Sequence, residues 1–137
     1  ATREGHVAVN NMFGIADRMR YSAIPSVIYT HPEVAQVGAT EEELKSKGIA
    51  YRKAVMPMAI AGRFMVEYAG KSGTVKVLVS EKYGQVLGVH AIGGCCGEFI
   101  ASACHMIELE LRVEDVRQIV FPHPTVSEAL KETVLHA

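Results

Sequence analysis

The sequence has no excess of charge of one sign and no long hydrophobic run. Its 137 residues carry 14 Lys and Arg against 15 Asp and Glu, which gives a formal net charge of −1. A chain without a basic block lacks the electrostatic footprint of a nucleic-acid-binding surface, so we expect no nucleic acid among its partners. No apolar run reaches the roughly 18–20 residues that a membrane span requires, so we also expect a soluble protein with no membrane partner.

Cysteine is scarce as well, and Cys95, Cys96 and Cys104 make an odd number. The adjacent pair has poor geometry for a mutual disulfide, which favours a reducing compartment and a cytoplasmic location. The three residues lack the C-x2-C spacing of a metal site, and no His pair lies near them at i, i+4, so no metal is predicted. An activated thiol at Cys95 or Cys96 stays open, although no partner base follows from the spacing.

The composition is that of one globular domain, with 49% apolar and 21% charged residues. The chain opens at Ala1 without Met or a secretory leader. Its first residues place Ala8, Met12, Ile15 and Met19 at helical spacing before Pro25. We therefore expect a fragment in which residues 1–23 form a helix that packs on something outside the sequence, followed by a domain over residues 24–137.

The hydrophobic pattern beyond the first segment predicts an α+β domain. Strands are expected at 24–30, 34–38, 51–58, 74–80 and 86–92, and helices at 41–47, from Gly97 to about Leu111, at 113–120 and from a capping box at 125–128 onward. The last two strands read as a hairpin, and Pro57 should place its strand at a sheet edge. Hairpin-like strands followed by segregated helices indicate a mostly antiparallel sheet with helices packed on one face.

A glycine-rich turn at residues 93–97, Gly-Gly-Cys-Cys-Gly, connects the last expected strand to a helix. Such a position superficially suggests a phosphate cradle. The turn matches neither G-x-G-x-x-G nor the lysine-containing P-loop, so we interpret it as a packing turn.

His123 differs from the other histidines because Pro122 and Pro124 frame it directly before a helix. A histidine that accepts protons near neutral pH needs a carboxylate at one ring nitrogen to fix its tautomer and raise its basicity. Glu128, one turn into the helix, is spaced to supply that carboxylate. The alternative is that Glu128 only completes a capping box with Thr125 and that His123 is a surface turn residue.

The remaining histidines have ordinary contexts. His31 precedes a proline in a turn, His90 alternates within a strand, His105 lies on a helix, and His6 and His136 are near the ends. None of them combines a rigid frame with a carboxylate one turn away.

Two segments at opposite ends of the domain resemble one enzyme family. Residues 121–129, Phe-Pro-His-Pro-Thr-Val-Ser-Glu-Ala, resemble the His-Pro-Thr-x-Ser-Glu signature that closes the flavin disulfide reductases. Residues 24–38 resemble the segment that enters the interface domain in the dihydrolipoamide dehydrogenase branch of that family, and residues 86–93 are similar too. The likeness covers about residues 24–137, and residues 1–23 resemble the helix that leads out of the FAD-binding domain.

The resemblance implies that the chain is a C-terminal dimerisation domain without the nucleotide-binding domains or the redox-active cysteine pair, which none of its three cysteines supplies. It implies that His123 reaches into the partner subunit's site and takes a proton from dihydrolipoamide. Glu128 would orient that histidine, and the backbone at His123 and Pro124 would contact the flavin. FAD and NAD would then belong to the full-length enzyme, with none bound to the inactive fragment.

The implied partners are a second copy of the chain, the missing domains, and a lipoyl-carrying protein of a 2-oxoacid dehydrogenase or glycine-cleavage complex.

The sequence departs from the family at two places. Residues 121–122, Phe-Pro, replace a second histidine often found two positions before the catalytic one, and residues 95–96, Cys-Cys, stand where Pro and Ala types are usual.

Two related reductases fit less well. A mercuric-reductase-like chain would carry Tyr near the catalytic histidine position and a terminal cysteine pair, whereas residues 135–137 are Leu-His-Ala. A glutathione-reductase-like chain shares the His-Glu arrangement but is disfavoured by the long match at residues 24–38. A module that only self-associates through its apolar faces is the alternative from outside the enzyme class.

Overall fold

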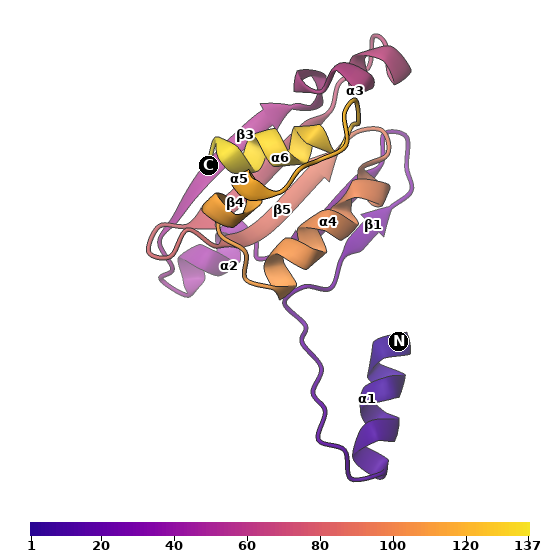
Figure 1. The fold of residues 1–137 in the computed structure, drawn as a ribbon, viewed down its shortest axis with the longest axis vertical. Coiled ribbons are helices and arrows are strands. Elements are labelled where there is room, and N and C mark those ends of the chain that lie inside the picture. Colours follow the sequence, from indigo (N-terminus) through magenta and orange to yellow (C-terminus); the bar gives the residue numbers. More distant parts are fainter.

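The computed structural model describes all 137 residues and contains one five-stranded antiparallel sheet with the order β1-β2-β5-β4-β3 (Figure 1). The strands are β1 (Ser26–Ile28), β2 (Val34–Gly38), β3 (Tyr51–Pro57), β4 (Thr74–Ser80) and β5 (Val86–Ile92). The helices are α1 (Thr2–Met12), α2 (Glu41–Ser46), the 3-10 turn η1 (Met58–Ile60), α3 (Gly62–Glu67), α4 (Cys96–Glu108), α5 (Val113–Gln118) and α6 (Glu128–Leu135).

The sheet is built on rows of small apolar residues, mostly valine, that meet across neighbouring strands. Val37 pairs with Val89, Val89 with Val77, and Val77 with Ala54, and all four side chains are buried. Side chains alternate between the two faces of a strand, so this register places the paired residues together on the face of the sheet that packs against the core. The predicted hairpin is β4–β5, and β3 lies at the sheet edge with Pro57 as its last residue.

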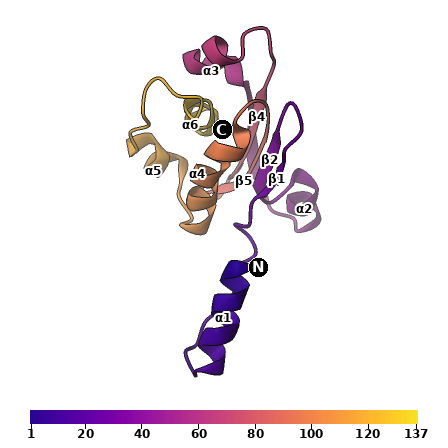
Figure 2. The same ribbon diagram turned by 90° about the vertical axis from the view of Figure 1, so that its right-hand side faces the viewer.

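The larger helices cover that apolar face, as the α+β prediction required. In Figure 2, α4, α5 and α6 lie on one side of the strands and the short α2 lies on the other. Helix α4 packs on β2 and β5, and α6 packs on β3, β4 and η1. Phe99, Ala103, Leu130 and Val134 point from these helices into one buried cluster.

The opposite face of the sheet holds α2 through its predicted capping box and an ion-pair network. The Thr40 hydroxyl accepts the Glu43 N–H at 3.2 Å, and the Glu43 carboxylate accepts the Thr40 N–H at 2.9 Å. Glu41 accepts hydrogen bonds from Lys76, Lys53 and Tyr51, and these bonds lower the pKa of its carboxyl to about 2.

The N-terminal segment is shorter and less regular than its apolar spacing predicted. Helix α1 ends at Met12, and Gly14 at φ +77° turns the chain, so Ile15 and Met19 lie beyond the helix. Figure 1 shows α1 standing apart from the domain, and none of its residues is buried. The pattern also missed η1 and α3, because helices of three and six residues leave little periodicity to detect. None of the helices has the length and apolar character to cross a membrane.

We predict that Gly88→Ala destabilises the domain. Gly88 faces Gly38 across β2 and β5, and a Cβ at Gly88 would lie 2.1 Å from the Ala39 carbonyl oxygen, a backbone atom. Overpacking of this kind costs about 1–3 kcal/mol, which urea denaturation would detect. Gly62→Ala is the matched control, because nothing lies within 4 Å of its Cβ and it opens α3. Equal stability of the two variants would contradict the close approach of the strands.

Candidate functional site

His123 lies on an extended segment between α5 and α6, at the surface of the helical layer. The segment is the stretch that leads into the yellow helix of Figure 1. The prolines on both sides exclude helical backbone for the residues before them, and the His123–Pro124 peptide is cis. The side chain of His123 is 80% exposed.

Glu128 holds the His123 ring by one nitrogen. The Glu128 Oε1 atom lies 2.9 Å from His123 Nδ1, and Glu128 Oε2 accepts the Thr125 backbone N–H at 2.9 Å. The hydrogen bond from the Thr125 N–H, which has the larger effect, and the one from His123 lower the pKa of the Glu128 carboxyl. The carboxyl is therefore ionised at neutral pH. An ionised carboxylate only accepts hydrogen bonds, so Nδ1 of His123 carries the hydrogen and Nε2 is the basic nitrogen of the neutral ring. Nε2 has no hydrogen-bond partner in the chain.

Thr125 closes the turn in a way that differs from the predicted capping box. Its hydroxyl donates to the Pro122 carbonyl oxygen at 2.7 Å, and Ser127 Oγ, 2.8 Å away, then donates to Thr125 Oγ1. The hydroxyl therefore makes no cap to the helix, and the N-cap of α6 is Ser127 without a side-chain cap bond. Of the two hydrogen bonds of the predicted capping box, only the one from the Thr125 N–H to Glu128 is present. The prediction that the Thr125 hydroxyl caps the helix was wrong. The capping alternative and the dyad are compatible, because Glu128 uses a different oxygen for each contact.

Helix α6 gives this turn a firm base. Ala129, Leu130, Thr133 and Val134 are each fully buried against the sheet, so the helix cannot shift without disturbing the core. Glu128 precedes these residues directly, which places its carboxylate at the exposed end of a buried helix.

Two surface cavities flank the His123 turn. One, of about 550 Å³, lies on the α4 side and is bordered by Pro124, Thr125 and Cys95. The other, of about 360 Å³, lies between α4 and the segment before His123 and is bordered by Val120 and Phe121. Val120, three residues before His123, is 90% exposed, so the segment carries exposed apolar surface.

The other histidines lie where their contexts predicted. His31 precedes the cis Pro32 in the β1–β2 turn, and His90 in β5 is half-buried with Nε2 3.1 Å from the Ala39 carbonyl oxygen. His105 is exposed on α4, and His6 and His136 are exposed near the ends. No three His, Cys, Asp or Glu side chains converge in a metal-binding geometry.

The cysteines are unpaired thiols with no sign of activation. Burial raises the pKa of Cys95, Cys96 and Cys104 above its ordinary value. A raised pKa leaves little thiolate at neutral pH, which argues against a nucleophilic role.

The glycine-rich turn is tightly packed against its neighbours. A Cβ at Gly94 would fall 2.0 Å from the Tyr68 ring, and one at Gly93 would fall 2.3 Å from Met58 Sδ. The Gly97 N–H, at the start of α4, already donates to Glu33 Oε2 at 3.0 Å. The turn is therefore occupied by the protein's own contacts, as a packing turn would be.

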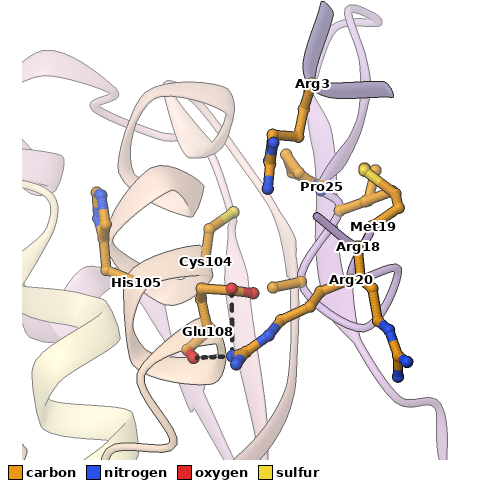
Figure 3. Close-up of a pocket in the computed structure, with 10 residues that line it drawn as sticks. Arg3, Arg18, Met19, Arg20, Pro25, Cys104, His105 and Glu108 are labelled. Carbon is orange, nitrogen blue, oxygen red and sulfur yellow. Dashed lines mark hydrogen bonds and ion pairs between the residues drawn. The ribbon is translucent and has the colours of Figure 1, made fainter. Parts of the chain in front are cut away.

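A third cavity, of about 410 Å³, marks where the N-terminal segment touches the domain (Figure 3). Arg20 reaches Glu108 of α4 at 3.4 Å, and Cys104 points into the space between them and Arg3. Arg3 is bound to Asp17 by two hydrogen bonds. Arg3 and Arg20 thus have partners within the chain, and the contact between Arg20 and Glu108 attaches the N-terminal segment to α4.

The family of the chain follows from its similarity to known proteins. Residues 24–134 match the model of the pyridine nucleotide-disulphide oxidoreductase dimerisation domain. The chain belongs to this family. Over its full length it is 42% identical to mitochondrial dihydrolipoyl dehydrogenase of Caenorhabditis elegans and covers 28% of that protein. It is 41% identical to the human mitochondrial enzyme over the same length and covers 27% of it. The chain thus spans little more than a quarter of these relatives.

Solved structures of the family have the same fold. LpdA from Mycobacterium tuberculosis aligns with a TM-score of 0.90 at 20% identity, over 99% of this chain and 30% of that one. The HOCl-induced flavoprotein disulfide reductase RclA from Escherichia coli aligns with a TM-score of 0.83 at 22% identity, over 95% of this chain and 30% of that one. These likenesses show that the dimerisation-domain architecture is present.

Sequence reasoning singled out His123, Pro124 and Glu128, and the structure brings all three together at one turn. It missed the hydroxyl of Thr125 as a clamp across the turn, and it missed the hydrogen bond from Lys131 of α6 to the Ile119 carbonyl oxygen. The lysine gave no signal, because a lysine on an exposed helical turn is common and usually solvated.

We predict that Glu128→Gln destabilises the chain in a pH-dependent way. Loss of the charged acceptor for Thr125 and His123 should cost about 1 kcal/mol at pH 7, as for a helix cap. The pKa of Glu128 is lowered by folding, so its contribution is complete above its ordinary value near 4.5 and is lost as the pH falls through the lowered value. In urea denaturation at a series of pH values, the difference in free energy of unfolding between Glu128→Gln and the unsubstituted chain should narrow below about pH 4.5. Glu132→Gln, one turn later on α6, is the control, and a gap that stays constant down to pH 3 would contradict this account.

Proposed function

We propose that the chain supplies an acid/base dyad, His123 and Glu128, to the active site of a homodimeric dihydrolipoamide dehydrogenase. The observation that carries this proposal is the ring held at Nδ1 by a carboxylate 2.9 Å away while Nε2 faces solvent on a side chain that is 80% exposed. A solvated surface histidine needs no such partner, whereas a general base does. The 41–42% identity with dihydrolipoyl dehydrogenases supports this branch of the family.

The dyad would act on a thiol proton. Dihydrolipoamide carries two thiols whose ordinary pKa leaves them mostly protonated at neutral pH, and only the thiolate attacks a disulfide. Nε2 of His123 takes the thiol proton, and Glu128 stabilises the imidazolium that results. FAD and NAD, held by other domains, supply the electron acceptors for the oxidation. This chain therefore contributes the group that accepts the proton and the contacts that position that group.

The disulfide that the substrate thiolate attacks must come from elsewhere than this chain. Its three cysteines are unpaired and partly or fully buried. A dimerisation domain associates with its own copy, so the exposed His123 would enter the partner subunit's site, with Val120 and its neighbouring apolar surface at the contact. A lipoyl-carrying protein would then deliver the substrate to the assembled dimer.

The full-length enzyme should lose most of its activity in the variant His123→Gln. Removal of a general base costs about 10²–10⁴-fold in kcat/KM for dihydrolipoamide. The change should fall on kcat, with the dimer intact by light scattering. His6→Gln, at an exposed histidine of α1 that borders neither cavity beside His123, is the matched control and should leave turnover unchanged.

A mixed dimer decides whether the histidine works across the subunit boundary. One subunit carries His123→Gln, and the other carries His123 but lacks the redox-active cysteine pair. Action in trans leaves one complete site, so the mixed dimer should have about half of the activity of the unsubstituted enzyme. An inactive mixed dimer would show that the histidine acts within its own subunit, and near-normal turnover of the His123→Gln homodimer would remove the base assignment altogether.

A further inference from the structure

The segment that presents His123 is held almost entirely by side chains. Between Ile119, the residue after α5, and Thr125, no backbone N–H or carbonyl of residues 120–124 takes part in a backbone–backbone hydrogen bond. Such a stretch has no regular structure to fix it, so the contacts that orient the ring must come from side chains.

Helix α6 supplies most of these contacts, at both ends of the segment. Glu128 binds the end near His123, as described above. Lys131, three residues later on the same helix, binds the other end: its Nζ donates to the Ile119 carbonyl oxygen. Residues three apart on a helix lie on the same face, so the two side chains reach the segment together.

Lys131 makes a second contact with the segment through Phe121. Its Nζ lies 5.5 Å from the centroid of the Phe121 ring, within the range of a cation–π interaction. Phe121 is half-buried and packs against the core, whereas Val120 beside it is 90% exposed. The ring is therefore the one apolar anchor of the segment, and the ammonium group joins it to the backbone at Ile119.

We propose that Lys131 is a positioning residue for His123. Together with Phe121 it fixes the segment upstream of the turn, as Glu128 and Thr125 fix it downstream, so that Nε2 is presented at one place and in one direction. Lys131 itself touches no reacting atom. This inference rests on the proposed function, since it assigns Lys131 an effect only through the base.

The test uses the full-length enzyme with Lys131→Met, which keeps the aliphatic stem but removes the donor and the charge. A displacement of about 1 Å at a catalytic group costs up to about a hundredfold, so kcat should fall by ten- to a hundredfold while KM and the melting temperature stay close to normal. Lys131→Arg should restore most of kcat, because a guanidinium group both donates to a carbonyl and stacks on an aromatic ring. Lys47→Met, an exposed lysine at the end of α2, is the control and should be silent.

The double variant His123→Gln/Lys131→Met separates positioning from a general structural role. With the base gone, loss of Lys131 should cause no further fall in kcat/KM. A further fall as large as that in the parent background would overturn the proposal, and so would a Lys131→Met enzyme within twofold of normal kcat or an arginine variant as slow as the methionine one. If the methionine variant fails to assemble, Lys131→Gln replaces it, since it keeps one donor and lacks the charge. Normal activity of His123→Gln alone would instead overturn the proposed function, so the two failures are distinguishable.

Discussion

The Glu128 carboxylate is the contact on which the site depends. One of its oxygens accepts the Thr125 N–H and the other faces His123 Nδ1, so a single charged group both begins the turn into α6 and selects the tautomer of the ring. The two tasks support each other, because the backbone bond holds the carboxylate where the histidine needs it. The fold makes the site rigid because the inner face of α6 is buried in the core. The exposed turn is bonded to this fixed helix and is therefore held in place.

Exposure of the turn follows from the function proposed for it. A base that serves its own domain could be enclosed, whereas one that serves a neighbouring subunit must project and still keep its geometry. The structure meets both demands with an extended segment that has no backbone pairing of its own and is tied down from α6 on either side of His123. Phe121 stands where the family resemblance led us to expect a histidine, and its ring meets Lys131.

Much of the fold could be predicted from residue patterns, and the failures have physical causes. Alternating valines predicted β4 and β5, and the capping box at Thr40 predicted the start of α2, because these signals are local. The extent of α1 was predicted wrongly because the apolar spacing continues past Gly14, although a glycine with positive φ is a common signal for the end of a helix. At the site, spacing was enough to pair His123 with Glu128. It could not show that the Thr125 hydroxyl turns to the Pro122 carbonyl, because a hydroxyl both donates and accepts and only the folded turn decides between its partners.

The tautomer of His123 tests the central claim most directly. Nitrogen-15 NMR of the histidine-labelled chain, recorded at a pH where the imidazole is neutral, distinguishes a ring nitrogen that carries hydrogen from one that does not. The account predicts hydrogen on Nδ1 and a bare Nε2, with that preference lost in Glu128→Gln. Hydrogen on Nε2, or an even mixture of the two forms in the unsubstituted chain, would contradict it.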